Sequence, residues 1–118
     1  MIDKEKLRAV ATITLSAVQD YVSVRGNAMA SGDDAYDKEV EDGIITELEA
    51  GNEWAWAAVT VCAEYAGVEG LAYLGGCSYA DAKDFREHSG YYSDMVEEAL
   101  SELANDLNRT HDQLEALK

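Results

Sequence analysis

The side chains that could perform catalysis are two histidines and two cysteines, and their arrangement favours no reaction. Nucleophilic catalysis needs a serine or cysteine beside a histidine base that a carboxylate orients, and only His88 and His111 could supply that base. His88 follows Glu87 at the end of a predicted short helix, where the helix dipole by itself favours a cation. We therefore expect no enzymatic activity, and a small enzyme using His88 and Cys77 is the third of three interpretations.

The sequence also lacks the spacing of a metal or anion site. Cys62 and Cys77 do not form the CxxC pairs of a zinc site and are too few for a disulfide scaffold, so we expect both to be reduced. The acidic residues 33–42 lack the alternating ligands and central glycine of a calcium loop. Gly75 and Gly76 could expose backbone amides to an anion, although a bend in a strand is the favoured interpretation. We expect no metal and no cofactor.

Composition indicates an acidic, folded protein. Of 118 residues, 24 are Asp or Glu and 9 are Lys or Arg, giving a formal charge of −15, while 47% are hydrophobic. The length predicts a single domain over residues 1–118. So few cations cannot form a general phosphate-binding surface, so we expect no direct nucleic-acid binding. The charged N-terminus and the lack of a long apolar run predict a cytoplasmic protein with no membrane segment.

Two helices are predicted in the N-terminal half. Apolar and small residues recur at three- and four-residue steps between an N-cap at Asp3 and about Arg25, the pattern of an amphipathic helix. A second helix follows the break at residues 31–34 and ends at Gly51. Its predicted inward positions recur every four residues, namely Tyr36, Val40, Ile44 and Leu48.

A β-hairpin is predicted next. Strand-favouring residues dominate from Glu53 to Tyr65, and a bulge near residues 57–58 would bring the tryptophans and the valines to one face. Residues 71–79 can return as the partner strand, and a turn at residues 68–70 would place Cys62 opposite Cys77. Because a two-stranded hairpin is unstable alone, it must lie against the helices or join a strand of another subunit.

The C-terminal part is predicted to be helical. Residues 78–81 have the spacing of a capping box, which predicts a short helix to about His88. Apolar residues then follow a heptad pattern from Val96 to Leu117, predicting a long helix that either packs within the domain or forms a homodimer. The candidate oligomerisation residues are Leu100, Leu103, Leu107 and Leu114. The predicted fold class is therefore α+β, with two N-terminal helices, a β-hairpin, a short helix and a long C-terminal helix.

More than half of the excess negative charge lies in residues 33–53, where nine acids face only Lys38. Such a row resembles the line of charge along DNA and would attract a basic protein surface, although solubility alone could also explain it. Exposed tyrosines beside an acid would suit contacts with arginine. The candidate partner-binding residues are Asp33, Asp34, Asp37, Glu39, Glu41, Asp42, Glu49, Tyr91, Tyr92 and Asp94.

Four short segments within residues 52–103 resemble a pattern in small uncharacterised proteins of phages, plasmids and other mobile elements. They are Asn52–Trp56, Tyr73–Tyr79, Asp84–Phe85 and Tyr91–Met95. The resemblance implies a genomic setting and brings no catalytic residues. By length and acidity alone, the chain is also similar to phage DNA mimics that block restriction enzymes and to some anti-CRISPR proteins.

These observations lead to two competing functions. The first is a non-enzymatic inhibitor from a mobile element, which binds the basic nucleic-acid groove of a restriction enzyme, a CRISPR effector or a similar host defence complex. The alternative is a structural or adaptor protein that self-associates through the C-terminal heptads and uses its acids for solubility. The first predicts binding that salt weakens, and the second predicts an oligomer.

Overall fold

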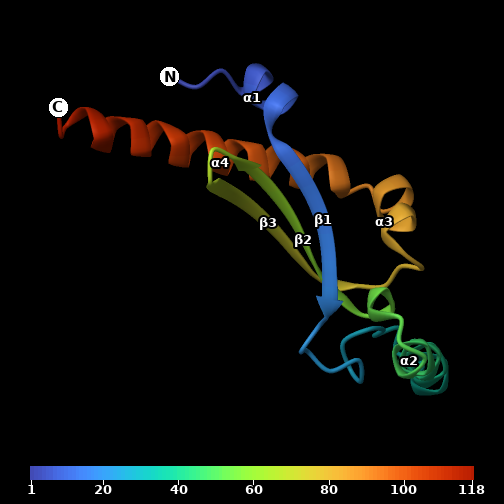
Figure 1. Cartoon of the computed structure of the whole chain (residues 1–118). Coiled ribbons are helices and arrows are strands. Elements are labelled where there is room, and N and C mark those ends of the chain that lie inside the picture. Colours follow the sequence, from blue (N-terminus) through green and yellow to red (C-terminus); the bar gives the residue numbers. More distant parts are fainter. The chain divides into compact units, whose positions relative to one another are not determined.

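The computed structural model describes all residues, 1–118, and confirms the α+β class. The elements in chain order are α1 (Lys4–Val10), β1 (Thr12–Gln19), α2 (Asp34–Glu49), a 3-10 turn η1 (Glu53–Ala55), β2 (Ala57–Tyr65), β3 (Val68–Cys77), α3 (Ala82–His88) and α4 (Tyr92–Glu115). The strands form one antiparallel sheet in the order β1-β2-β3 (Figure 1). None of the helices combines the length and apolar character that crossing a membrane requires.

The chain forms two compact units, which we describe separately. Unit 1 comprises residues 1–15, 60–73 and 90–118, and therefore holds α1, the whole turn between β2 and β3, and α4. Unit 2 comprises residues 16–59 and 74–89, and therefore holds α2, η1 and α3. Each unit has its own set of buried apolar side chains.

The predicted first helix, from Asp3 to Arg25, is wrong beyond its first two turns. Asp3 is the N-cap, as predicted, but the helix ends at Val10 and β1 starts at Thr12. Exposed and half-buried residues alternate along most of this strand, which is the period of a strand with one covered face. The β-branched residues around Ile13 favour a strand, and pairing with β2 overrides the helical spacing of the apolar residues. This third strand also supports the hairpin, which the sequence left without a strand partner.

The hairpin turn is tighter than predicted and changes the register of the cysteines. Only Ala66 and Gly67 connect β2 and β3, and both have positive φ angles of 55° and 78°, as a type I′ turn requires. A two-residue turn pairs Tyr65 with Val68, so continuing this register places Cys62 opposite residue 71 rather than opposite Cys77. The predicted cysteine pairing is therefore wrong.

The bulge predicted near residues 57–58 is also wrong, because the tryptophans precede the strand. Trp54 lies in η1 and Trp56 caps it, so β2 begins only at Ala57. From there buried and half-buried residues alternate without interruption to Glu64. Asn52 starts the 3-10 turn by accepting a hydrogen bond from the Trp54 amide (3.1 Å), which explains why this aromatic segment is not extended.

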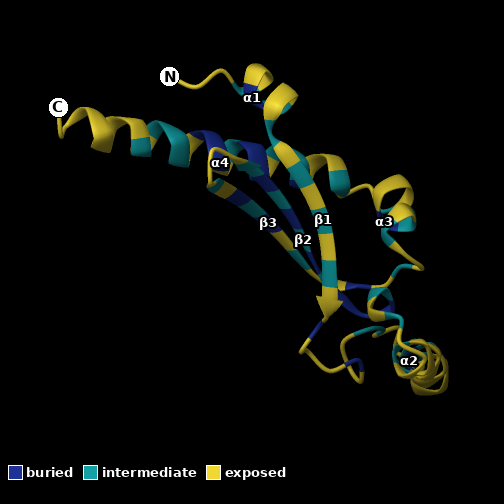
Figure 2. Ribbon diagram, in the orientation of Figure 1, coloured by how far each residue is buried: buried dark blue, intermediate teal, exposed yellow.

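In unit 1, α4 packs against the hairpin at a glycine. Met95, Ala99, Leu100, Leu103 and Ala104 are its buried residues (Figure 2). Gly70 of β3 allows the close approach, because a Cβ there would lie 2.1 Å from the backbone oxygen of Ala99. Leu100 and Leu103 are wholly buried in this contact, so neither can form an oligomer interface, and their predicted role is wrong.

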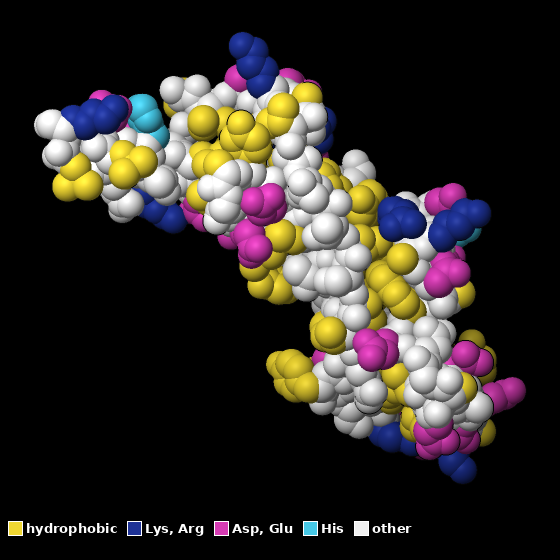
Figure 3. Space-filling model, viewed as in Figure 1, with side chains coloured by type: hydrophobic (Ala, Val, Ile, Leu, Met, Phe, Trp, Pro, Cys, Tyr) yellow, Lys and Arg dark blue, Asp and Glu magenta, His cyan; other side chains and the backbone are white.

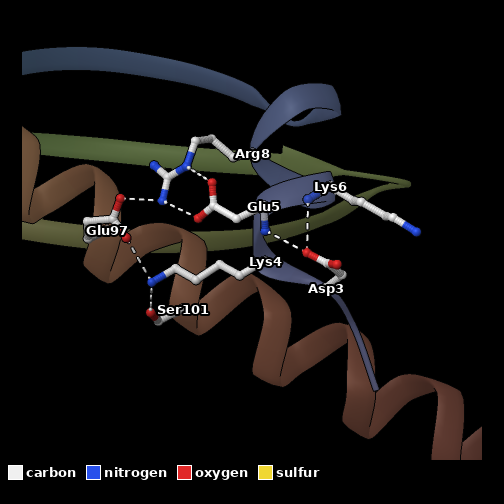
Figure 4. A network of polar contacts seen from close by, with 7 residues as sticks. All are labelled: Asp3, Lys4, Glu5, Lys6, Arg8, Glu97 and Ser101. Carbon is white, nitrogen blue, oxygen red and sulfur yellow. Dashed lines mark hydrogen bonds and ion pairs between the residues drawn. The ribbon is translucent and has the colours of Figure 1, made fainter.

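Ion pairs fasten α1 to α4 within the same unit. Glu97 of α4 pairs with Lys4 (Nζ to Oε2, 2.9 Å) and with Arg8, and the Lys4 ammonium also donates to the hydroxyl of Ser101 at 2.7 Å (Figure 4). Both cations lower the pKa of Glu97, mainly through these hydrogen bonds. Leu7 of α1 is buried. A small apolar contact therefore holds α1 in addition to these ion pairs.

In unit 2, Phe85 of α3 anchors an aromatic cluster. Its ring lies 5.7 Å from that of Trp54 and 5.1 Å from that of Tyr79, with an edge-to-face arrangement in the second pair. The predicted capping box is wrong in detail, because the N-cap of α3 is Asp81, which accepts a hydrogen bond from the Asp84 amide. The predicted end of this helix at His88 is confirmed.

A buried carboxylate joins two segments of unit 2. Asp20 is only 7% exposed, and its two oxygens accept hydrogen bonds from the amides of Val22 (3.0 Å) and Gly76 (2.8 Å). These two bonds lower the pKa of Asp20, because they favour the charged form. Gly76, whose φ is 64°, is therefore the place where β3 is tied to the residue that follows β1.

We expect Asp20→Asn to destabilise the protein by about 1–2 kcal/mol at pH 7, because an amide loses one charge-assisted hydrogen bond. The pKa of Asp20 is lower in the folded state, so its contribution is complete above the unfolded pKa of about 3.9 and is lost as the pH falls through the folded pKa. Urea unfolding of both proteins at pH 7 and at pH 2.5 measures the difference in their free energies of unfolding and its loss in acid. Equal stability of the two proteins at pH 7 would contradict the role of this carboxylate.

Candidate protein-binding surface

The acidic helix α2 has the predicted boundaries. Asp33 caps its N-terminus by accepting from the amides of Ala35 (3.1 Å) and Tyr36 (3.2 Å), and Gly51, with a φ of 95°, ends it. Its predicted inward positions are only partly covered, because Val40, Ile44 and Leu48 are half-buried and Tyr36 is exposed. The helix therefore lies at the surface of unit 2, with most of its circumference open.

Two of the candidate contact residues instead hold the preceding loop against α2. Glu41 is 7% exposed, pairs with Arg25 (3.2 Å) and accepts from the Gly26 amide (2.7 Å). Asp42 pairs with the other nitrogen of the same guanidinium. Glu41 is thus a buried structural carboxylate, and its predicted place on the exposed contact surface is wrong.

Asp33 and Asp37 also have partners inside unit 2. Asp33 is the cap, and Asp37 accepts hydrogen bonds from the backbone amide (3.1 Å) and the hydroxyl (2.6 Å) of Ser31. These bonds fix the turn that leads into the helix. Substituting either residue would therefore change the fold locally as well as the charge.

Four acids of α2 are exposed and have no hydrogen bond or ion pair. We call them the free α2 acids, namely Asp34, Glu39, Glu47 and Glu49. Figure 3 shows acidic side chains gathered where α2 forms the surface. At about 100° per residue, Glu39, Asp42 and Glu49 fall within about 80° of one another on the solvent side. A basic partner could reach the free α2 acids without breaking any internal contact, whereas Asp42 would first have to release Arg25.

The last turn of α2 opposes its own helix dipole. Glu47 and Glu49 lie there, and the turn contains no basic residue. A negative charge at a helix C-terminus is unfavourable by about 0.3–1 kcal/mol. Neither glutamate has an internal partner, so no contact within unit 2 offsets this cost.

The remaining candidate contact residues belong to unit 1. Tyr91 is exposed at the start of α4, Tyr92 is half-buried, and Asp94 is exposed in the first turn of the helix. Further along α4, Leu107 is half-buried and Leu114 is exposed. Of the four candidate oligomerisation residues, these two alone remain at a surface.

The histidines and cysteines do not meet in a catalytic arrangement. His88 bonds only to Asp84 (Nδ1 to Oδ1, 2.9 Å) on the surface of α3, and Cys77 is buried and donates to the Leu74 carbonyl (3.5 Å). Burial is the main cause that raises the pKa of both thiols, Cys62 and Cys77. Both are therefore mainly protonated at neutral pH, which disfavours nucleophilic attack. No group of three or more His, Cys, Asp or Glu side chains could hold a metal ion.

Comparison with known proteins identifies no family. No protein-family model matches the chain, and no curated protein or solved structure is significantly similar to it. The surface chemistry of the chain itself must therefore carry the functional argument.

Sequence analysis missed two features of this surface. Arg25 was assigned to the end of the first predicted helix, whereas it neutralises two acids of α2. Gly43, which interrupts the helical pattern of residues 34–49, lines a groove beside α2. A glycine within an otherwise regular helical pattern is the signal that could have drawn attention to this position.

Proposed function

We propose that the protein is a non-enzymatic inhibitor, which binds a basic nucleic-acid-binding surface of a bacterial defence complex in the host cytoplasm. The observation that carries this proposal is the last turn of α2, where Glu47 and Glu49 are exposed, unpaired and opposed to the helix dipole. A chain that keeps such charges sacrifices local stability. If a basic partner covered these two glutamates, their charges would stabilise the complex instead of destabilising the helix.

The spacing of the acids along α2 supports an imitation of DNA. The helix of 16 residues is about 24 Å long at 1.5 Å per residue. Over that length it carries the four free α2 acids, Asp34, Glu39, Glu47 and Glu49, which is about one per 6 Å on average. One strand of B-DNA has a phosphate about every 3.4 Å along its axis. A groove that binds a phosphate strand would therefore meet free carboxylates at about half the density of the phosphates.

Cleavage assays with purified restriction endonucleases and CRISPR effector complexes test this proposal. We expect at least one enzyme to be inhibited, with the inhibition weakened by salt and by added non-substrate duplex DNA, because both compete for the same basic groove. The protein should leave the DNA substrate itself unbound in a gel-shift assay. Unaffected cleavage by every enzyme at micromolar protein would contradict the proposal.

The alternative function, self-association, has one specific observation in its favour. Every residue from His111 to Lys118 is exposed, and among them Leu114 and Leu117 are 56% and 83% exposed. An apolar hollow of about 440 Å³ lies beside Leu107 in the same unit and is lined in part by Val10 and Tyr65. A second copy could cover this end of α4.

Leu114→Glu with Leu117→Glu should convert such an oligomer to monomer, because two charges would then lie in its apolar seam. Neither residue contributes to the core of unit 1, so the melting temperature of a monomer should stay within a few degrees of the wild-type value. Sedimentation equilibrium gives the mass of both proteins. A wild-type protein that is already monomeric at 100 µM or so, far above the roughly micromolar range of specific interfaces, would rule out the structural role.

A further inference from the structure

A groove of about 630 Å³ opens beside α2 in unit 2. Val40, Gly43, Ile44 and Glu47 of α2 line it together with Asn52, Ala55, residues 78–80 and Asp84. The groove thus lies on the side of α2 where the unpaired Glu47 is found. None of the hydrogen bonds and ion pairs of unit 2 requires this groove to be empty.

The chemistry of the groove suits a cation with apolar surfaces. No Lys or Arg lines it, while Glu47 and Asp84 both do. Asp84 already accepts from the Ala80 amide (3.0 Å) and bonds to His88, and these contacts lower its pKa, so it is charged at neutral pH. Val40 and Ile44 provide apolar area, and Tyr79 provides an aromatic ring.

Gly43 is the feature that the fold alone does not explain. It lies within α2 without a positive φ, and a Cβ added there would meet no atom within 4 Å. A glycine inside a helix lowers its stability relative to alanine, and it allows a ligand to approach the backbone closely. Because no neighbour in the chain requires it, the open space it leaves in the groove wall points to a group from outside.

We propose that this groove receives an arginine side chain of the basic partner, with its guanidinium at Glu47 and its stem against Val40 and Ile44. Arginine fits better than lysine, because its planar head is weakly hydrated and is favoured beside aromatic rings. The inference rests on the proposed function and adds to it a specific contact. The free α2 acids would attract a basic surface, and the groove would select the residue that docks.

The test uses a nine-residue oligo-arginine peptide and its oligo-lysine counterpart, with amide chemical shifts of the full-length protein followed by NMR. We expect oligo-arginine to shift the amides of residues 43–47 and 79–84 most strongly and to bind more tightly than oligo-lysine. Gly43→Leu should fill the groove and weaken oligo-arginine binding by about tenfold or more. Its melting temperature should not fall, because a Cβ at residue 43 meets no atom within 4 Å and leucine favours a helix more than glycine does.

Two further variants separate the possible outcomes. Thr46→Leu adds the same side chain to an exposed position of α2 outside the groove and should bind like the wild type. Glu47→Gln removes the anchoring charge and should weaken binding without any change in volume. Wild-type affinity of both Gly43→Leu and Glu47→Gln would overturn the groove contact. Gly43→Leu and Glu47→Gln could bind oligo-arginine normally while the double variant Glu39→Lys with Glu49→Lys abolishes nuclease inhibition. In that case the proposed function would stand and the groove contact would not.

Discussion

Replacing three free α2 acids with lysine should raise the half-inhibitory concentration against the target nuclease by about 100-fold. The variant is Glu39→Lys with Glu47→Lys and Glu49→Lys. Each substitution removes an exposed attraction of up to about 1 kcal/mol, so three together approach the 2.7 kcal/mol or so that equals 100-fold. The DNA-cleavage assay measures this change directly, at one fixed salt concentration.

The same variant should be at least as stable as the wild type. Lysines at positions 47 and 49 complement the helix dipole that the glutamates oppose, and none of the three acids has an internal partner to lose. Loss of inhibition would therefore coincide with an unchanged or higher melting temperature. This combination would show that the three acids contact a partner and do not support the fold. A substitution of the buried Glu41 could not show this, because it would also disturb the fold.

A charge-matched control keeps net charge from explaining the result. Glu98→Lys with Glu102→Lys and Asp112→Lys alters three exposed, unpaired acids of α4 and changes the net charge by the same amount. We expect it to inhibit within about threefold of the wild type at physiological salt, where screening acts beyond about 8 Å. An equal loss in both variants would mean that overall charge alone governs binding, and the assignment of the surface to α2 would be wrong.

Gly70→Ala should destabilise the protein strongly. A Cβ at residue 70 would lie 2.1 Å from the carbonyl oxygen of Ala99 and 2.5 Å from the amide nitrogen of Leu103. Both are backbone atoms of α4, so the helix must move away from β3 and uncover Leu100 and Leu103. We expect a loss of about 3 kcal/mol, at the upper end of overpacking effects, and a fall in melting temperature of about 10 °C.

Gly43→Ala is the matched control for this substitution. It makes the same chemical change in a helix whose glycine has open space around it, and it should raise stability by up to about 1 kcal/mol. Thermal unfolding followed by circular dichroism compares the two variants under one set of conditions. If Gly70→Ala melts with the wild type, α4 does not approach β3 at this residue.

Local signals were sufficient for the parts of the fold that local contacts decide. The N-cap at Asp33 and the stop at Gly51 predicted α2, and the heptad pattern predicted α4. The first helix failed because the spacing of its apolar residues fits both a helix and a strand, and pairing of β1 with β2 decided between them. That pairing joins segments about 45 residues apart, and no local pattern records it.

The site was predicted at the level of the helix and not of its individual residues. Composition located the negative charge on α2, but it could not separate Glu41, which Arg25 and Gly26 bind, from Glu39, which is free. Both residues are acidic and lie two positions apart, and only the path of the preceding loop distinguishes them. The groove escaped prediction for the same reason, because part of its lining comes from residues 78–80 and Asp84, far from α2 in the sequence.

Capture of proteins on the immobilised wild type and on the two triple-lysine variants, across a salt series, tests the central claim most directly. The three immobilised proteins are exposed to a lysate of a bacterium with active restriction and CRISPR systems, and duplex DNA serves as competitor. We expect the wild type to capture a DNA-binding nuclease or effector complex that high salt or duplex DNA releases. The α4 variant should still capture this complex, and the α2 variant should not. A bound set that is identical for both variants, or that contains no nucleic-acid-binding protein, would contradict it.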